Sequence, residues 1–294
     1  MKRILIPALV LLAAVVVSPI RAADGPFPSP KVGKVFVAAQ TVTTDGAMSN
    51  FFAPGSTVVF RAYAVDAKTH RILTKKAVKY FYAKIPGTPN VKMRYTPKAK
   101  AASGRWAWTG AWKVPSDYAL GIVNFRVLVT TKTTRKGAFR QVPVTSAQLT
   151  ITTTPQLPPG PPPSSSSTAA SASLDIALYA DTVNGAGVGG RPLGCTQTNV
   201  FKRGEEVVVR AWGFDLKTGA VLSNDNVEQA TFSLPGVSKI NLNWGAHGPQ
   251  QVFMWTNAWN IPAAYPLGDV VIQIQFKTIT GKVGKLAYPI TIIP

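Results

Sequence analysis

The chain has 294 residues, of which 46% are hydrophobic and 15% charged, and its formal net charge at pH 7 is +20. This apolar fraction excludes a disordered chain, because it is high enough to build sizeable cores. The single Cys excludes an internal disulfide, so packing alone must hold the fold together. The many Val, Thr, Gly and Pro residues favour strands and turns over helices.

Residues 1–22 have the pattern of a secretory signal peptide. Lys2 and Arg3 precede an uncharged apolar stretch over residues 4–17, and small residues around Ala22 offer a cleavage site. The apolar stretch is short for a spanning helix and contains a proline, so cleavage is favoured over retention as a membrane anchor. We therefore expect a secreted or periplasmic protein that does not span a membrane after cleavage.

Residues 33–153 are predicted to form a first domain of short strands. The strands are expected near residues 34–42, 57–65, 77–84, 91–96, 104–113, 121–131 and 145–152. Clusters of Gly, Pro, Asn and Asp separate them. Seven short strands at this spacing indicate a sandwich of two sheets.

One stretch of this domain is strongly basic. Its cations, with no acidic residue among them, are Lys75, Lys76, Lys79, Lys84, Lys92, Arg94, Lys98, Lys100 and Arg105. They are the predicted contacts to an anionic ligand, with a solvated face that aids solubility as the alternative. Tyr80, Phe81, Tyr82 and Tyr95 interleave with them, as in single-stranded nucleic-acid grooves. Export instead favours lipopolysaccharide, acidic polysaccharide, extracellular DNA or anionic lipid over intracellular nucleic acid.

Tryptophans follow the basic stretch at alternating positions. Trp106, Trp108 and Trp112 share one face of a strand, and Phe253, Trp255 and Trp259 do the same later in the chain. We expect these faces to be core. The alternative is an exposed aromatic platform for sugar rings, for which the candidates are Trp112, Trp244 and Trp259.

Residues 154–172 are rich in Pro and Ser and are predicted to be an extended, partly flexible linker that spaces two domains. The second domain, residues 173–294, has strands expected near 174–182, 206–214, 228–234, 238–243, 251–259, 269–278 and 287–293. An insertion of eight residues before Asn199 carries Cys195. A thiol tucked against the end of the sandwich is favoured there over a reactive thiol or an intermolecular bridge.

The chain contains an internal duplication. Residues 50–74 match residues 199–223 at 11 of 25 positions, and residues 108–127 match 255–274 at 9 of 20. The two blocks follow in the same order at nearly the same separation. Both halves are therefore predicted to share one topology.

The duplicated segments VVFRAYAVDAKT and VVVRAWGFDLKT, together with the pattern W-x-x-x-W-x-[VI]-P-x-x-Y-x-L-G, resemble bacterial immunoglobulin-like or fibronectin-III-like repeats. The resemblance covers both halves. It implies an all-β fold of two tandem immunoglobulin-like antiparallel β-sandwiches joined by the Pro/Ser-rich linker. It also implies a role in adhesion, binding or spacing, because the fold alone does not define a function.

Three further features occur in both copies. They are Asp66 and Asp215, the pairs Arg61–Tyr63 and Arg210–Trp212, and the tyrosines Tyr118 and Tyr265. We expect the aspartates to start turns rather than bind calcium, which needs several converging oxygen ligands. Each arginine is expected to lie over the ring two residues on, with ligand binding as the alternative. The tyrosines are expected to tie corners of the sandwich.

The charge is unequally divided between halves that share a fold. Residues 24–155 contain 20 Lys and Arg against 4 Asp, or +16, whereas residues 174–294 contain 9 against 8 acidic residues, or +1. We therefore predict an exported, non-enzymatic binding protein whose basic first domain contacts an anionic polymer or surface. A structural or assembly component of a cell-envelope complex, with a protein partner, and a carbohydrate-binding accessory module are the alternatives.

Catalytic machinery is not expected. The two His residues, His70 and His247, lie in different halves. Apart from Asp, the chain offers only one Cys and three Glu as further acid, base or nucleophile candidates. A nucleophile with its base needs such groups to converge. No catalytic residue, metal site or cofactor is predicted.

Overall fold

The computed structural model describes residues 34–96, 108–141, 148–154, 174–185, 196–247 and 251–294. These residues form strands, turns and bends, and no helix occurs among them. In particular, none of them belongs to a helix with the length and apolar character needed to cross a membrane. The predicted all-β sandwich fold is confirmed.

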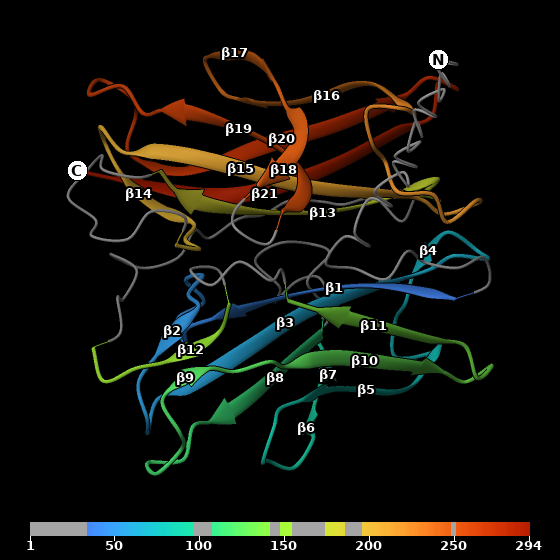
Figure 1. The fold of residues 1–294 in the computed structure, drawn as a ribbon, viewed down its shortest axis with the longest axis vertical. Coiled ribbons are helices and arrows are strands. Elements are labelled where there is room, and N and C mark those ends of the chain that lie inside the picture. The colour runs from blue at the N-terminus through green and yellow to red at the C-terminus, as the bar shows by residue number, and fades with distance from the viewer. Residues whose placement is uncertain (1–33, 97–107, 142–147, 155–173, 186–195, 248–250) are drawn as a thin grey trace, which may run out of the picture.

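The first half of the chain forms two layers of strands (Figure 1). Its strands are β1 (Val35–Val42), β2 (Phe51–Phe52), β3 (Thr57–Asp66), β4 (Arg71–Ile72), β5 (Val78–Lys84), β6 (Val91–Lys92), β7 (Arg94–Tyr95), β8 (Trp108–Lys113), β9 (Gly121–Ile122), β10 (Arg126–Thr131), β11 (Lys136–Arg140) and β12 (Thr150–Ile151). One layer has the order β1-β3-β8-β7, with β4 beside β3. The other consists of β11-β10-β5-β6 and the small sheet β2-β12-β9.

The second half repeats this arrangement with longer strands. They are β13 (Ile176–Asn184), β14 (Val200–Lys202), β15 (Glu206–Asp215), β16 (Val227–Leu234), β17 (Val237–Asn241), β18 (Asn243–His247), β19 (Val252–Asn260), β20 (Gly268–Thr278) and β21 (Val283–Ile293). The layer β13-β15-β19-β18 corresponds to β1-β3-β8-β7, and β14-β21-β20-β16-β17 corresponds to the remaining strands of the first half. The two halves therefore have one strand order, as the duplication predicts.

Each half departs from a purely antiparallel sandwich at one pairing. β2 runs parallel to β12, and β14 runs parallel to β21. In both cases the strand that follows the first turn lies beside the last strand of its half. The many residues between the partners make this possible, because parallel neighbours cannot be joined by a short hairpin.

Several predicted strands are divided in the structure. The stretch 91–96 forms β6 and β7 in different layers, because Met93 between them points into the core and is 2% exposed. Leu242 divides β17 from β18 in the same way. The strand expected at 121–131 is interrupted between β9 and β10. The strands β2, β4, β11 and β14, and β18 beyond Asn243, were not predicted, because they are too short or too polar to give a clear alternation.

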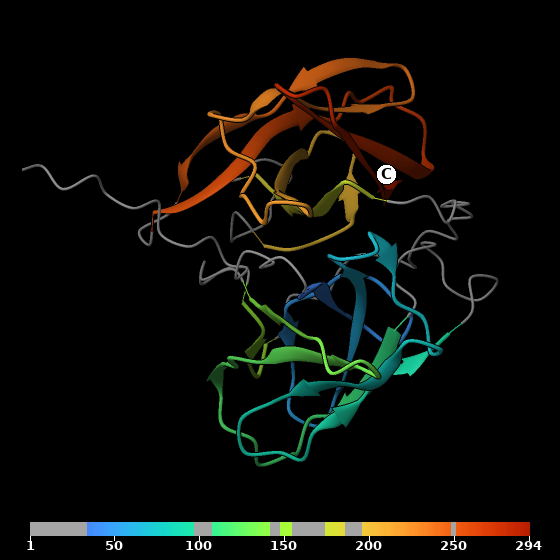
Figure 2. The same cartoon turned by 90° about the vertical axis from the view of Figure 1, so that its right-hand side faces the viewer.

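The two halves pack face to face, as Figures 1 and 2 show for β1 and β13, and residues 155–172 of the predicted linker lie outside the described residues. Every residue of these two strands is buried. The ring centroids of Phe36 and Phe214 are 5.5 Å apart, and the hydroxyl of Tyr63 donates a hydrogen bond to the carbonyl of Leu178. One cluster of buried apolar residues continues across the contact.

The contact uses equivalent surfaces of the two halves. Cross-strand pairs Gln40–Arg61 and Ala38–Tyr63 lie on one side, and the corresponding pairs Asp181–Arg210 and Tyr179–Trp212 lie on the other. The duplicated motif of an arginine followed two residues later by an aromatic residue is thus part of the interface between the halves. Both copies of the motif are therefore used in the same contact.

Gly137 on β11 allows the two layers of the first half to approach closely. A Cβ atom at this position would lie 2.2 Å from the carbonyl oxygen of Val35, which is backbone and cannot move aside cheaply. We expect Gly137→Ala to destabilise the protein by about 1 to 3 kcal/mol, as overpacking does. Urea unfolding measures this, with Gly245→Ala as control, since a Cβ there meets nothing closer than 3.8 Å. Equal stability of the two variants would contradict the close approach.

Candidate functional site

The outward face of the sheet β11-β10-β5-β6 carries a concentration of cations. Alternation along β10 places Val127 and Val129 in the core and leaves Arg126 exposed on the opposite side. The register then aligns Arg126 with Lys84 on β5 and with Arg140 on β11. Three cations from three neighbouring strands therefore form one row across the sheet.

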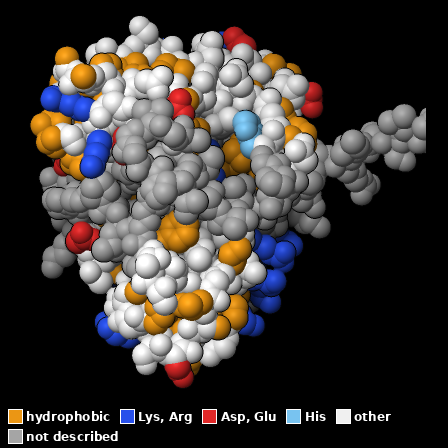
Figure 3. Space-filling view, turned by 60° about the vertical axis from the view of Figure 1, so that its left-hand side comes forward, with side chains coloured by type: hydrophobic (Ala, Val, Ile, Leu, Met, Phe, Trp, Pro, Cys, Tyr) orange, Lys and Arg blue, Asp and Glu red, His pale blue; other side chains and the backbone are white. Residues whose placement is uncertain are grey.

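Two more cations and two tyrosines extend this surface. Thr130 on β10 lies between Tyr80 on β5 and Lys136 on β11, so these three residues form a second row across the sheet. Lys92 on β6 lies opposite Tyr82 on β5. We call the exposed set Lys84, Lys92, Arg126, Lys136 and Arg140 the basic face. Tyr80 is 56% exposed, and the ammonium group of Lys79 lies 5.3 Å from its ring centroid. Figure 3 shows the Lys and Arg side chains (blue) along the margins of the lower, first half.

The basic face has no acidic residue among its members or their cross-strand partners. The described acidic residues of the first half are Asp45, Asp66 and Asp117, and all three lie outside this sheet. Asp66 forms an ion pair with Arg135. Like charges directly opposite one another destabilise a sheet, so the row Lys84, Arg126 and Arg140 opposes folding. An external anion would remove this repulsion.

The second half shows that the sandwich does not need these charges. Equivalent registers place Ser233, Gln273 and Ala287 in the row that corresponds to Lys84, Arg126 and Arg140. Asn241 takes the place of Lys92. The same positions of the same strand arrangement thus carry no charge.

The structure divides the predicted ligand-binding cations among three places. Lys84 and Lys92 belong to the basic face, and Lys79 lies at its edge, at an irregularity of β5. Lys75 and Lys76 are exposed in the turn before β5, and Arg94 on β7 belongs to the other layer. Lys98, Lys100 and Arg105 lie outside the described residues.

The other three members of the basic face were not predicted from the sequence. Arg126, Lys136 and Arg140 lie far along the chain from residues 75–105, and only the pairing of β5, β10 and β11 brings them together. A signal was present, because Arg126 and Arg140 each sit at an outward position of a strand that alternates with buried residues. A search for alternating basic residues over the whole half would have found them.

The predicted core position is confirmed for three of the aromatic residues, whereas Phe253 and Trp259 are only half-buried. Trp108, Trp112 and Trp255 are at most 6% exposed, so Trp112 is no open platform for a sugar ring. Trp244 and Trp259 are half-buried, and Trp244 contacts the rings of Phe253 and Trp255. Trp106 lies outside the described residues, as does Cys195.

The duplicated turn and corner residues have the predicted structural roles. Asp66 accepts hydrogen bonds from the backbone N–H of Lys68 at 2.8 Å and of Thr69 at 3.3 Å, and Asp215 does the same for the equivalent N–H groups in the second half. Burial alone would raise the pKa of Asp215, but hydrogen bonds from Lys282 and this turn hold it below its ordinary value.

The hydroxyl of Tyr118 donates to the carbonyl of Pro86, and that of Tyr265 donates to Pro235, each at 2.9 Å. Both tyrosines therefore tie the end of one layer to a turn of the other. Burial raises the pKa of both phenols.

The predicted stacking of arginine on an aromatic ring is confirmed in the second half only. The guanidinium of Arg210 lies 6.0 Å from the ring centroid of Trp212 and forms two hydrogen bonds of 2.7 Å with Asp181. In the first half Gln40 takes the place of Asp181, and Tyr63 instead bonds across the interface. Burial lowers the pKa of Arg61, an effect that nearby Asp45 partly opposes.

Among the described residues, no group of three or more His, Cys, Asp or Glu side chains converges in a way that could hold a metal ion.

No protein-family profile and no curated protein sequence matches the chain. Among solved structures it is similar to SGBP-B of the Bacteroides ovatus mixed-linkage glucan utilization locus, in complex with a mixed-linkage heptasaccharide. That match has 10% identity and a TM-score of 0.19 and covers 83% of this chain and 43% of that one. A second is the native conformation of E. coli alpha-2-macroglobulin, at 13% identity and a TM-score of 0.26, covering 92% and 15%. The chain thus spans less than half the length of either protein.

Proposed function

We propose that this chain is an exported, non-enzymatic binding protein whose first half contacts an anionic polymer or surface through the basic face. The observation that carries the proposal is the row Lys84, Arg126 and Arg140. These residues repel one another across neighbouring strands, whereas the equivalent row of the second half is uncharged. Charges that oppose folding and have no ion-pair partner among the described residues are best explained by an external one.

We further assign each half to the immunoglobulin-like sandwiches. The layer β1-β3-β8-β7 has the order of strands A, B, E and D of such domains, and β5, β10 and β11 take the places of C, F and G. This architecture supports a contact function, since its sheets present broad faces to solvent. Secretion or periplasmic localisation rests on the signal-like residues 1–22.

Binding to polyanions at rising salt tests the proposed function. The full chain should be retained on heparin and on DNA but not on neutral dextran. If each of five cations neutralises one anionic group, the logarithm of affinity for DNA should fall by roughly 4 per tenfold rise in salt. Failure to bind any polyanion at low salt would overturn the proposal and favour a structural component of an envelope complex.

A further inference from the structure

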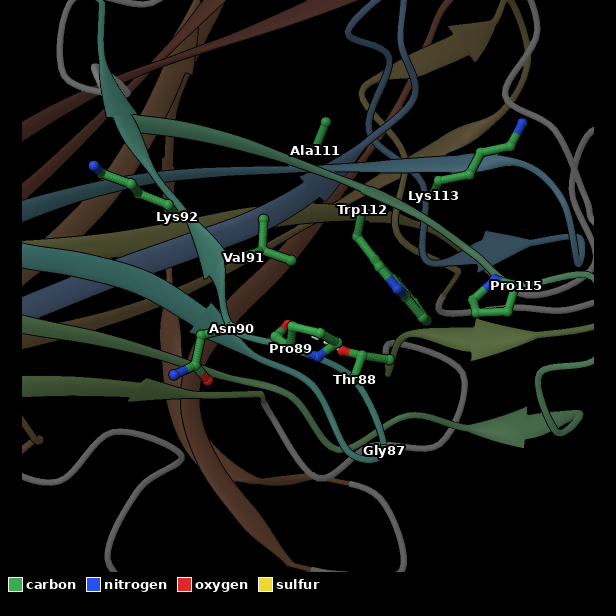
Figure 4. Close-up of a pocket in the computed structure, with 10 residues that line it drawn as sticks. All are labelled: Gly87, Thr88, Pro89, Asn90, Val91, Lys92, Ala111, Trp112, Lys113 and Pro115. Atoms are coloured by element: carbon green, nitrogen blue, oxygen red, sulfur yellow. Dashed lines mark hydrogen bonds between the residues drawn. The ribbon is translucent and has the colours of Figure 1, made fainter.

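A pocket lies at the edge of the basic face, between the β5–β6 connection and the end of β8 (Figure 4). Its volume is about 460 Å³, within the roughly 300 to 1,000 Å³ that is usual for small-molecule sites. The lining includes Thr88, Pro89, Lys92, Trp112, Lys113 and Pro115. Because Lys92 also belongs to the basic face, a polymer lying on that face reaches the pocket without a gap.

The pocket is open because the β5–β6 connection is irregular. In the second half, residues 237–241 form the five-residue strand β17 beside β16. In the first half, only Val91 and Lys92 pair with β5. Pro89 has no N–H to donate to a sheet, which accounts for the shorter strand. The residues before Val91 therefore arch away from β5 and line the pocket (Figure 4).

Trp112 lines this pocket with little of its ring exposed. Its ring makes a T-shaped contact with Tyr118 at 5.0 Å, and the residue is 6% exposed. The N–H groups of Trp108 and Trp255 donate to backbone carbonyls at 3.0 and 2.6 Å. The N–H of Trp112 has no hydrogen-bond acceptor among the described residues, and its nitrogen is not fully buried. It is thus a donor within reach of a ligand.

Two lysines flank the pocket, and they distinguish it from the equivalent place in the second half. Lys92 and Lys113 are exposed and stand on opposite sides in Figure 4, with ammonium groups outside the pocket on flexible stems. Their counterparts are Asn241 and Asn260, beside Trp259. A donor and two cations around apolar Pro and Val surfaces favour a ligand that carries both a ring and a negative charge.

We infer that the Trp112 pocket binds one acidic saccharide unit of an anionic glycan, so that the ligand of the basic face is an acidic polysaccharide. This inference rests on the proposed function. A sugar ring offers hydroxyl and carboxylate acceptors to the indole N–H and the lysines, and C–H groups to Pro89 and Pro115. A nucleobase would need an open aromatic face, which Trp112 does not have. A bare ion would leave most of the 460 Å³ unfilled.

Calorimetry with the full chain tests this inference with two probes of equal charge. One is a galacturonate tetramer, and the other is an oligodeoxynucleotide with four phosphates. Trp112→Phe should weaken binding of the tetramer about tenfold, because it removes a hydrogen bond to a charged or polar acceptor. It should change binding of the oligonucleotide less than twofold. Trp259→Phe is the matched control and should change neither.

A second variant, Lys92→Asn with Lys113→Asn, introduces the residues of the second half at exposed positions and keeps the test valid if Trp112→Phe does not fold. This double variant should also weaken binding of the tetramer more than binding of the oligonucleotide. If the wild-type chain binds oligonucleotide but not tetramer, or if the variants weaken both equally, the pocket inference is wrong while the proposed function stands. If the wild-type chain binds neither probe and no polyanion column, both fail.

Discussion

Asp181→Ala should destabilise the folded protein by about 3 to 5 kcal/mol, because it leaves the guanidinium of Arg210 buried beside an empty space. Asp181 is 0% and Arg210 is 4% exposed, and two hydrogen bonds of 2.7 Å join them. Asp181 also accepts hydrogen bonds from Gln197 at 2.7 Å and from the hydroxyl of Tyr179 at 3.3 Å. Removing the carboxylate therefore leaves donors unsatisfied at the interface between the halves.

The first half supplies a matched control for this substitution. Gln40 occupies the position equivalent to Asp181, opposite Arg61, and its side-chain oxygen has no hydrogen-bond partner among the described residues. Gln40→Ala should therefore cost about 1 kcal/mol or less. Urea unfolding at pH 7 gives both values. A loss for Asp181→Ala no larger than that for Gln40→Ala would show that the buried ion pair does not hold the interface.

The interface also explains why the duplicated arginine and aromatic residues were only partly understood from the sequence. Alternation correctly places Arg61 with Tyr63, and Arg210 with Trp212, on one face of a strand. Whether that face contacts solvent, a ligand or another sheet depends on how the halves are placed. Neighbouring residues along a strand carry no information about this. The burial of all of β1 and β13 is the consequence that only the structure shows.

Local pattern was sufficient for the long strands and insufficient for the site. β3 and β15, for example, lie within one residue of their predicted bounds, because apolar residues alternate through each. The basic face instead depends on register. A shift of one residue between β5 and β10 would move Arg126 away from Lys84, and nothing in either segment alone specifies that pairing. The basic stretch 75–105 therefore contains only two of the five members of the basic face, Lys84 and Lys92.

Replacing the row of the basic face by the residues of the second half should remove most of the polyanion affinity. The variant is Lys84→Ser with Arg126→Gln and Arg140→Ala, which copies Ser233, Gln273 and Ala287. Each lysine or arginine near an anionic surface contributes about 1 kcal/mol, so three together should lower affinity roughly a hundred-fold. For DNA, the slope of log affinity against log salt should become shallower by about 2 to 3.

The same variant should be at least as stable as the wild-type chain, because it removes repulsion between cations that face one another across β5, β10 and β11. This combination of weaker binding and undiminished thermal stability separates a contact surface from a structural one. Lys34→Ser with Lys68→Ser and Arg71→Gln removes three exposed cations of the first half that lie outside the basic face. This control should lower heparin and DNA retention only slightly. If it lowers retention as much as the row variant does, the binding follows net charge, and the register of the sheet has no part in it.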